Sequence, residues 1–256
     1  MGSEMCIRDR GIHIESKAIR KNGDELFVDI SIAPLTTNKQ NLFISIVRDI
    51  TNRKKSEKEL KRSYEKLQKT LDGIILAIVN LVEIKDPYTS GHQRRVAKLS
   101  VAIAKKLGMD MEQVKAIETA SKLHDIGKIE IPPEILSRPG KLSQNQFNII
   151  KEHPMIGYNI LKSIEFPWRI AEIVLQHHER MDGSGYPNGL CADKLLPEAK
   201  IIGVADVVEA MASHRPYRPA LGVEAALQEI QKFKGKIYPA DIVNACIQVF
   251  EDGFEF

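Results

Sequence analysis

Apolar residues near the N-terminus alternate with polar ones, as they do in strands that are buried on one face. The runs lie at Ile12–Ile14, Leu26–Ile32 and Leu42–Val47, and turn-forming residues separate them. Asn22-Gly23, between the first two runs, is typical of a hairpin. We therefore expect a small antiparallel sheet of three strands, which reads as part of a domain rather than a whole one.

The next region, residues 52–81, has apolar residues at alternating steps of four and three. This 3.5-residue repeat is typical of a two-stranded coiled coil, and Lys, Arg and Glu fill the outward positions. A single amphipathic helix packed on its own domain would give a similar pattern, and the last part of the repeat could serve both purposes. The repeat consists of Leu60, Tyr64, Leu67, Leu71, Ile74, Ile78 and Leu81.

Beyond residue 74 the spacing of apolar residues is helical to the end of the chain. One helix over Val96–Leu107 is ended by Gly108, and another over Val114–Leu123 ends at His124-Asp125. Further helices are expected at residues 149–161, 170–177, 201–211, 223–233 and 241–250. The expected fold class is mainly α: an all-α helical bundle preceded by a long coiled-coil helix and a small antiparallel β fragment.

The composition is that of a globular protein of one or two domains, with 256 residues, 43% of them hydrophobic and 28% charged. The net charge is +3, but residues 51–70 contain eight basic and three acidic residues. The basic surplus of this one segment exceeds that of the whole chain. Binding to a nucleic-acid polymer is therefore not expected.

Cysteine usage and apolar run lengths favour a cytoplasmic protein. Cys6, Cys191 and Cys246 are odd in number and far apart, which is typical of a reducing compartment. No apolar run is long enough for a membrane segment, and no secretory signal is recognisable. Residues 1–10 match nothing that follows and are interpreted as an expression-tag or sequence-assembly remnant.

Histidine and acidic residues gather in the helical region. Five of the seven histidines lie between residues 92 and 178, each within six residues of an Asp or Glu. Imidazole and carboxylate without thiolate suit iron, manganese or nickel better than a thiolate zinc site. A helical bundle can bring such side chains together in its core, and six ligands suit two metals that share a bridging water or hydroxide. The six are His124, Asp125, His153, His177, His178 and Asp206.

Two N-terminal segments carry a first family resemblance. Arg20–Val28 and Ile46–Thr51 resemble the last strands of a PAS sensor domain and the Asp-Ile-Thr sequence that follows them. Residues 11–51 are therefore identified as a C-terminal PAS fragment. The resemblance implies no intact sensor pocket here, because the elements that complete such a pocket would precede these strands.

A longer resemblance covers residues 74–253. The matching motifs are Asp86–His92 with Arg95-Val96, His124–Ile129, Ile135–Leu142, His153-Pro154 with Gly157, His177–Pro187, Ile202–Asp206 and Arg215–Leu221. Together they resemble the HD-GYP subgroup of the HD-domain phosphohydrolases. The resemblance implies a bacterial signalling enzyme that hydrolyses cyclic di-GMP to linear pGpG, to GMP or to both, with a two- or three-metal centre.

The resemblance also implies roles for individual residues. The same six residues would be metal ligands, with iron or manganese favoured and nickel also allowed. Lys128 would contact a phosphate oxygen and, with Asp125, form the catalytic set. Gly185, Tyr186 and Pro187 would frame the substrate, Tyr186 as a packing or stacking residue rather than an acid. Two arginines would pair with phosphate unless they are merely a surface pair: Arg215 and Arg218.

Two positions depart from the family pattern. Arg138 stands where lysine is common, which keeps the charge. Tyr88 stands where a carboxylate would serve a third metal, so two metals are expected and a third is not. His92 is left open as an additional ligand.

The expected mechanism uses the two cations to lower the pKa of a bridging water and to offset charge on the phosphate. Two alternatives stay open. The first is an HD phosphohydrolase that acts on another nucleotide, such as a different cyclic dinucleotide. The second is a degenerate domain that only signals, against which the intact ligand set argues. A homodimer through the helix of residues 60–81 is also expected.

Overall fold

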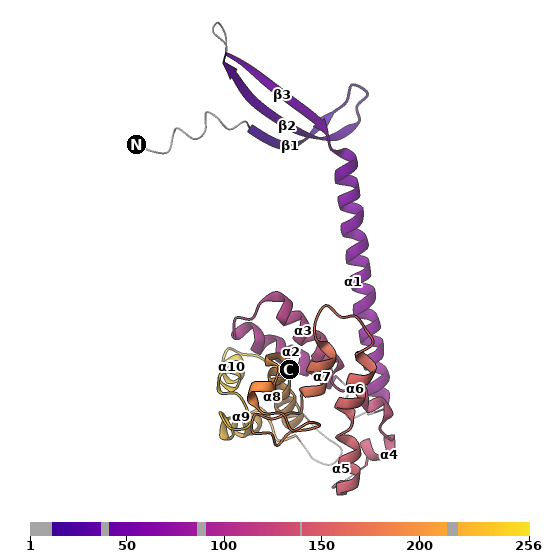
Figure 1. Cartoon of the computed structure of the whole chain (residues 1–256), viewed down its shortest axis with the longest axis vertical. Coiled ribbons are helices and arrows are strands. Elements are labelled where there is room, and N and C mark those ends of the chain that lie inside the picture. The colour runs from indigo at the N-terminus through magenta and orange to yellow at the C-terminus, as the bar shows by residue number, and fades with distance from the viewer. Residues whose placement is uncertain (1–11, 37–40, 86–90, 139, 214–219) are drawn as a thin grey trace, which may run out of the picture. The chain divides into compact units, whose positions relative to one another are not determined.

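The computed structural model describes residues 12–36, 41–85, 91–138, 140–213 and 220–256. The chain divides into two compact units, residues 1–72 and 73–256. Figure 1 shows the element order: three strands, one long helix and then a series of shorter helices. The predicted fold class, mainly α with one small antiparallel sheet, is confirmed.

The first unit contains the sheet. Its strands are β1 (Ile12–Ile19), β2 (Glu25–Thr36) and β3 (Asn41–Asp49), antiparallel in the order β1-β2-β3. Gly23 has a φ of 90° in the turn between β1 and β2, a conformation that glycine adopts without steric cost. Ile30 pairs with Ile14 on one side and Val47 on the other, so branched apolar side chains line up across the three strands.

Side-chain hydrogen bonds fix the connection from β3 to the long helix. The backbone N–H of Thr51 donates to the carboxylate of Asp49 at 2.9 Å, and Arg20 donates to the same carboxylate at 2.5 Å. The backbone N–H of Phe27 donates to the Thr51 hydroxyl at 2.9 Å, and Ile50 is buried. The Asp-Ile-Thr sequence therefore has a local structural reason: it joins the start of the helix to the sheet.

The long helix, α1 (Thr51–Lys85), is continuous over 35 residues and extends beyond the expected 52–81. The predicted repeat is exposed in its first part, where Leu60, Tyr64, Leu67 and Leu71 are each at least 47% exposed. Near the end of α1, Val79 and Val82 are buried on another face, and Ile78 packs against the same core. The last turns of α1 thus belong to the second unit, while the first turns leave their apolar stripe uncovered.

The second unit is a set of helices around one apolar core. They are α2 (His92–Lys106), α3 (Met111–Leu123), η2 (Ile126–Glu130), α4 (Pro133–Leu136), α5 (Gln144–Ile150), α6 (His153–Leu161), α7 (Ile170–Gln176), η3 (Ala192–Lys194), α8 (Pro197–Ala212), α9 (Val223–Lys232) and α10 (Ala240–Glu251). α2 packs on α3 and α8, and α6 packs on α7 and η2. Leu99, Ile117 and Ile201 are fully buried in this core. No described helix combines the length and apolarity that crossing a membrane requires.

One expected helix is wrong. The pattern predicted a single helix over 149–161, whereas α5 ends at Ile150 and α6 begins at His153. Pro154 sits in the first turn of α6, where its missing N–H costs nothing, but it could not continue α5. The break matters because it places His153 at the start of a helix, directly beside the end of another.

Candidate metal centre

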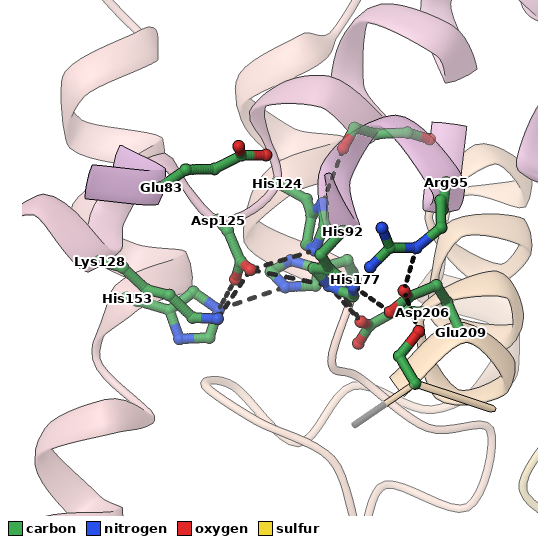
Figure 2. A network of polar contacts seen from close by, with 12 residues as sticks. Glu83, His92, Arg95, His124, Asp125, Lys128, His153, His177, Asp206 and Glu209 are labelled. Carbon is green, nitrogen blue, oxygen red and sulfur yellow. Dashed lines mark hydrogen bonds and ion pairs between the residues drawn. The ribbon is translucent and has the colours of Figure 1, made fainter. Parts of the chain in front are cut away.

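The six predicted ligands and His92 converge in the core of the second unit, and Figure 2 shows most of them. They come from five places in the chain: the start of α2, the end of α3, the start of α6, the end of α7 and the middle of α8. All are buried except His178, which is partly exposed. The side chains are His92, His124, Asp125, His153, His177, His178 and Asp206.

Three of the histidines are oriented in the same way by helix ends. Nδ1–H of His124 donates to the carbonyl of Ser121 at 2.7 Å, at the end of α3. His153 donates likewise to the last carbonyl of α5, and His177 to a carbonyl in the last turn of α7, at 2.7 and 2.6 Å. The last carbonyls of a helix have no partner within it, so they are free to accept these bonds. Each ring therefore carries its proton on Nδ1 and keeps Nε2 as a lone pair.

The unprotonated nitrogens face one another. Nε2 of His153 lies 3.3 Å from Nε2 of His177, and both rings are fixed through Nδ1. Nε2 of His124 is buried and has no hydrogen-bond partner among the described residues. Lone pairs this close, together with an unsatisfied buried nitrogen, are unfavourable unless a cation lies between them. The donor set therefore fits a divalent metal ion.

Asp125 lies between the histidines. Its Oδ1 is 3.4 Å from Nε2 of His153, while its Oδ2 is 3.5 Å from Nε2 of His124 and 3.8 Å from Nε2 of His92. The two oxygens of one carboxylate thus face two different groups of imidazoles. This is the arrangement that a carboxylate bridging two cations requires.

His92, left open by the sequence, is brought into the same cluster. Its Nε2 lies 3.1 Å from Oδ1 of Asp206, which is also 3.9 Å from Nε2 of His124. On its other side, Nδ1 of His92 hydrogen-bonds to the carboxylate of Glu209. His92 therefore has the same design as the other three histidines, with a carboxylate in place of a helix-end carbonyl.

Glu209 is a buried acid that the sequence reasoning missed. It is fully buried on α8, one turn after Asp206, and accepts from His92, from Arg95 Nε at 2.7 Å and from the Ser213 hydroxyl at 2.7 Å. Burial alone would raise the pKa of Glu209, but the bond from His92 and the other donors lower it to about 2. The carboxylate is therefore charged and holds His92 in place (Figure 2).

Burial and charge also set the ionisation of the cluster. Burial lowers the pKa of His153 to about 4, although Asp125 opposes the shift. Burial holds the pKa of His177 and of His178 well below its usual range. Burial alone would raise the pKa of Asp125, but Lys128 and the histidines outweigh it and hold this pKa well below its usual range. The cluster therefore offers carboxylates and neutral imidazoles, the forms that bind metal ions.

The cluster contains three overlapping groups whose ligand atoms lie within 4.8 Å of one another. The groups are His153, His177 and His178; His92, His124 and Asp206; and His124, Asp125 and His177. The first two share no member, and Asp125 approaches both, His153 through Oδ1 and His124 and His92 through Oδ2. The geometry therefore has room for more than one cation.

Lys128 stands beside the cluster on η2. Its ammonium lies 2.7 Å from Oδ2 of Asp125, in a part-buried ion pair. A Cβ atom on Gly127 would lie 1.9 Å from the carbonyl oxygen of His153, so only glycine permits η2 to approach α6 this closely. The Asp-Ile-Gly-Lys sequence thus holds Asp125 and Lys128 against the His153 segment.

The loop around Gly-Tyr-Pro packs directly on the histidine pair. A Cβ atom on Gly185 would lie 2.4 Å from Cα of Glu179, again a contact that only glycine allows. The Tyr186 ring packs against the His178 ring with 4.7 Å between centroids and a tilt of 32°, and burial raises the pKa of the Tyr186 hydroxyl. Glu179, also missed, is buried and accepts from the backbone N–H groups of Asn188 and Leu190 at 2.7 and 3.0 Å, which holds the loop.

Arg215, Arg218 and Tyr88 lie outside the described residues. Pro187 follows Tyr186 in the loop, and Arg138 has no described contact with the cluster. Glu209 escaped the sequence reasoning because its partner His92 lies 117 residues away along the chain. Arg95, which the sequence analysis named only within a motif, donates to this same Glu209. Glu179 lies next to His178, and that adjacency was the one available signal.

Fold and cluster together define a helical domain that carries a buried His/Asp centre suited to divalent metal ions. Residues 77–242 match the HD domain family, so this chain belongs to the HD domain family. The predicted membership of the HD superfamily is thereby confirmed. The proposed PAS origin of the sheet stays a prediction.

Relatives share this domain. The chain is 37% identical over 194 residues to the cyclic di-GMP phosphodiesterase response regulator RpfG of Xanthomonas campestris pv. campestris, covering 75% of this chain and 51% of the relative. It is 40% identical over 205 residues to a cyclic di-GMP phosphodiesterase of Thermotoga maritima, covering 75% and 56%. A solved structure, the HDG"Y"P protein Bd1817 of Bdellovibrio bacteriovorus, matches in fold with a TM-score of 0.54, 21% identity and coverage of 62% and 51%. The chain spans about half the length of the curated relatives it matches.

Proposed function

We propose that this chain is a metal-dependent phosphodiesterase that hydrolyses cyclic di-GMP to linear pGpG, to GMP or to both. The observation that carries the proposal is the cluster of inward-facing imidazole lone pairs around Asp125. Two relatives that share this domain are named for that activity.

The ligand distances support a division of the cluster between two cations. His92, His124 and Asp206 would hold one, and His153, His177 and His178 the other. Asp125 would reach both, because each of its oxygens faces a different group. Iron or manganese is favoured, nickel also fits an imidazole and carboxylate set, and a third metal is not expected.

The cations would supply Lewis-acid chemistry, activating water and offsetting negative charge on the phosphodiester. The protein itself would orient the reacting groups. It fixes the tautomers of the histidines, buries the ligand side chains and places a charged lysine beside them. Lys128 is held by Asp125 at the edge of the cluster, where its ammonium can also approach a phosphate oxygen. Gly185, Tyr186 and Pro187 would frame the substrate, and Arg215 and Arg218 would add phosphate contacts.

The deciding experiment is anaerobic purification with metal analysis, followed by turnover of cyclic di-GMP and identification of the products. About two bound ions per chain and conversion to pGpG or GMP are expected. A panel with cyclic di-AMP and a mixed guanine–adenine cyclic dinucleotide tests the first alternative, another nucleotide substrate. A metal-loaded protein that cleaves none of them would instead support the second, a signalling module without activity.

We also propose that the protein is a cytoplasmic homodimer. The exposed repeat on the first turns of α1 supports a parallel coiled coil with a second copy. Its domains would be a PAS fragment at 11–51, a signalling helix at 52–81 and the HD-GYP domain at 74–253. Light scattering tests the assembly.

A further inference from the structure

Lys151 lies in an unusual place beside the candidate metal centre. It is the residue after α5, two positions before His153. Its ammonium lies over the Phe147 ring, 4.9 Å from the centroid, and over the Tyr186 ring, 5.3 Å from the centroid. Tyr186 in turn packs against His178, so a single aromatic ring separates this cation from a candidate metal ligand.

The lysine has no acidic partner among the described residues. Other lysines of this unit form ion pairs, as Lys128 does with Asp125 and Lys122 with Glu118. Lys151 is instead held between two aromatic faces, which attract a cation but leave its charge uncompensated. Lys151 itself is half-buried.

An exposed aromatic ring, that of Phe147, lies beside the Lys151 ammonium. Phe147 is 42% exposed although it is a large aromatic residue, and in the described structure its ring contacts the Lys151 ammonium. Backbone geometry keeps the two together, because the N–H of Lys151 donates to the carbonyl of Phe147 at 3.0 Å. An exposed aromatic face beside an uncompensated cation is the combination that binds a nucleotide: the ring stacks with the base and the cation pairs with the phosphate.

We propose that Phe147, Lys151 and Tyr186 form a second subsite, which binds the non-reacting half of a cyclic dinucleotide. This inference rests on the proposed function. When one phosphodiester lies at the metal centre, the other lies across the same closed ring, where a neighbouring cation can pair with it. Lys151 pairs with that second phosphate, and Phe147 stacks with a purine attached to it.

If this subsite exists, its variants should affect the kinetics of a cyclic dinucleotide and those of a small diester differently. The subsite contributes to substrates with two phosphates and a purine, and it contributes nothing to a small diester that occupies the metal centre alone. Bis(p-nitrophenyl) phosphate is such a diester, because it has one phosphate and no purine. The two substrates therefore report separately on the metal centre and on the subsite.

The test compares Lys151→Met and Phe147→Leu with the unmodified metal-loaded protein. For Lys151→Met we expect KM for cyclic di-GMP to rise about tenfold or more, the scale of one lost charge-assisted hydrogen bond, with kcat changed less than about twofold. Phe147→Leu should raise KM about five- to tenfold through lost stacking. Hydrolysis of bis(p-nitrophenyl) phosphate should stay within about twofold for both.

A binding measurement provides a readout that does not depend on turnover. The phosphorothioate analogue of cyclic di-GMP resists hydrolysis, and its Kd by titration calorimetry should weaken by the same factor as KM in each variant. Lys151→Arg should restore most of the affinity, because it keeps the positive charge.

The matched control is Lys162→Met. Lys162 also lies over an aromatic ring, 5.7 Å from the centroid of Tyr158, but it lies nine residues after His153, about 13 Å further along α6. This variant should leave both substrates unaffected.

Two results would overturn the inference alone. One is a Lys151→Met protein with unchanged KM and Kd for the cyclic dinucleotide, while the unmodified protein cleaves it. The other is an equal loss on both substrates, which would mean that Lys151 only supports the fold around Tyr186. If the unmodified protein is metal-loaded and neither binds nor cleaves cyclic dinucleotides, the proposed function fails first and the subsite fails with it.

Discussion

The two units of this chain differ in how far their apolar side chains are buried. In residues 73–256, the helices pack around one apolar core, in which Leu99, Ile103 and Ile117 are completely buried. In residues 12–72, side chains of the same kind are open to solvent: Phe43 is 74% exposed and Leu60 is 73% exposed. The difference teaches that the helical unit is self-sufficient in its core, while the sheet and the first turns of α1 present surfaces suited to contact with another surface.

The strongest way to sharpen this comparison is to remove function from the helical unit alone. The double variant His124→Ala/Asp125→Ala loses one candidate terminal ligand and the candidate bridge together. Turnover of cyclic di-GMP should be abolished and bound metal should fall in elemental analysis. Helical content by circular dichroism should be retained as the control. Undiminished hydrolysis would refute the assignment of the site.

A matched pair of substitutions tests the core directly. Ile117 is fully buried in the helical unit, and Ile44 on β3 is 51% exposed. Ile117→Ala should lower the free energy of unfolding by about 2–5 kcal/mol, because it opens a cavity in a closed core. Ile44→Ala should change it by less than about 0.5 kcal/mol. Urea denaturation measures both, and equal effects would contradict the contrast between the units.

Glu209 provides a smaller and more selective effect. Glu209→Gln removes the charge that orients His92 and also weakens the contact with Arg95. Metal affinity should fall about 10- to 100-fold, as expected when a partner of a ligating histidine is lost. Competition with a chelator measures this. Ser213→Ala, which removes only one bond to the same carboxylate, is the control and should have a much smaller effect.

The gentlest perturbation concerns assembly. Leu67→Asp/Leu71→Asp should shift the protein towards monomer in light scattering while metal content and turnover of bis(p-nitrophenyl) phosphate remain unchanged, because both residues lie in the exposed repeat. Lys66→Asp/Lys69→Asp places two aspartates on the outward face and should leave the assembly intact. An unmodified protein that is monomeric at tens of micromolar (about the range for a short coil) would make the repeat a simple amphipathic helix.

Sequence patterns predicted the elements well where the signal was local. The three strands, the helix that ends at Leu123 and the one stopped after Lys106 follow from alternation, periodicity and Gly108. The break after Ile150 was missed because apolar spacing continues across it, although Pro154 marks it. Periodicity describes faces of a helix and is insensitive to a short interruption that preserves the face.

The same distinction between local and long-range signals applies to the candidate site. Dense pairs such as His124-Asp125 could be recognised, because their neighbours in sequence are also their neighbours in space. The environment of His92 could not be predicted, since Glu209 lies 117 residues away and only the packing of α2 on α8 joins them. Lys151 was overlooked for a related reason: its significance depends on a loop that returns to it from Tyr186.

The hydrogen bonds from His124, His153 and His177 to helix-end carbonyls have a consequence for how this domain can vary. The orientation of each imidazole depends on a carbonyl in the last turn of the helix before it. It does not depend on the length of that helix or on the residue where the helix begins. Residues can therefore be gained or lost at the N-terminal ends of α3, α5 and α7 without changing the orientation of the rings. A change of one residue in the last turn would rotate the acceptor away. Insertions should thus be tolerated at one end of these helices and forbidden at the other.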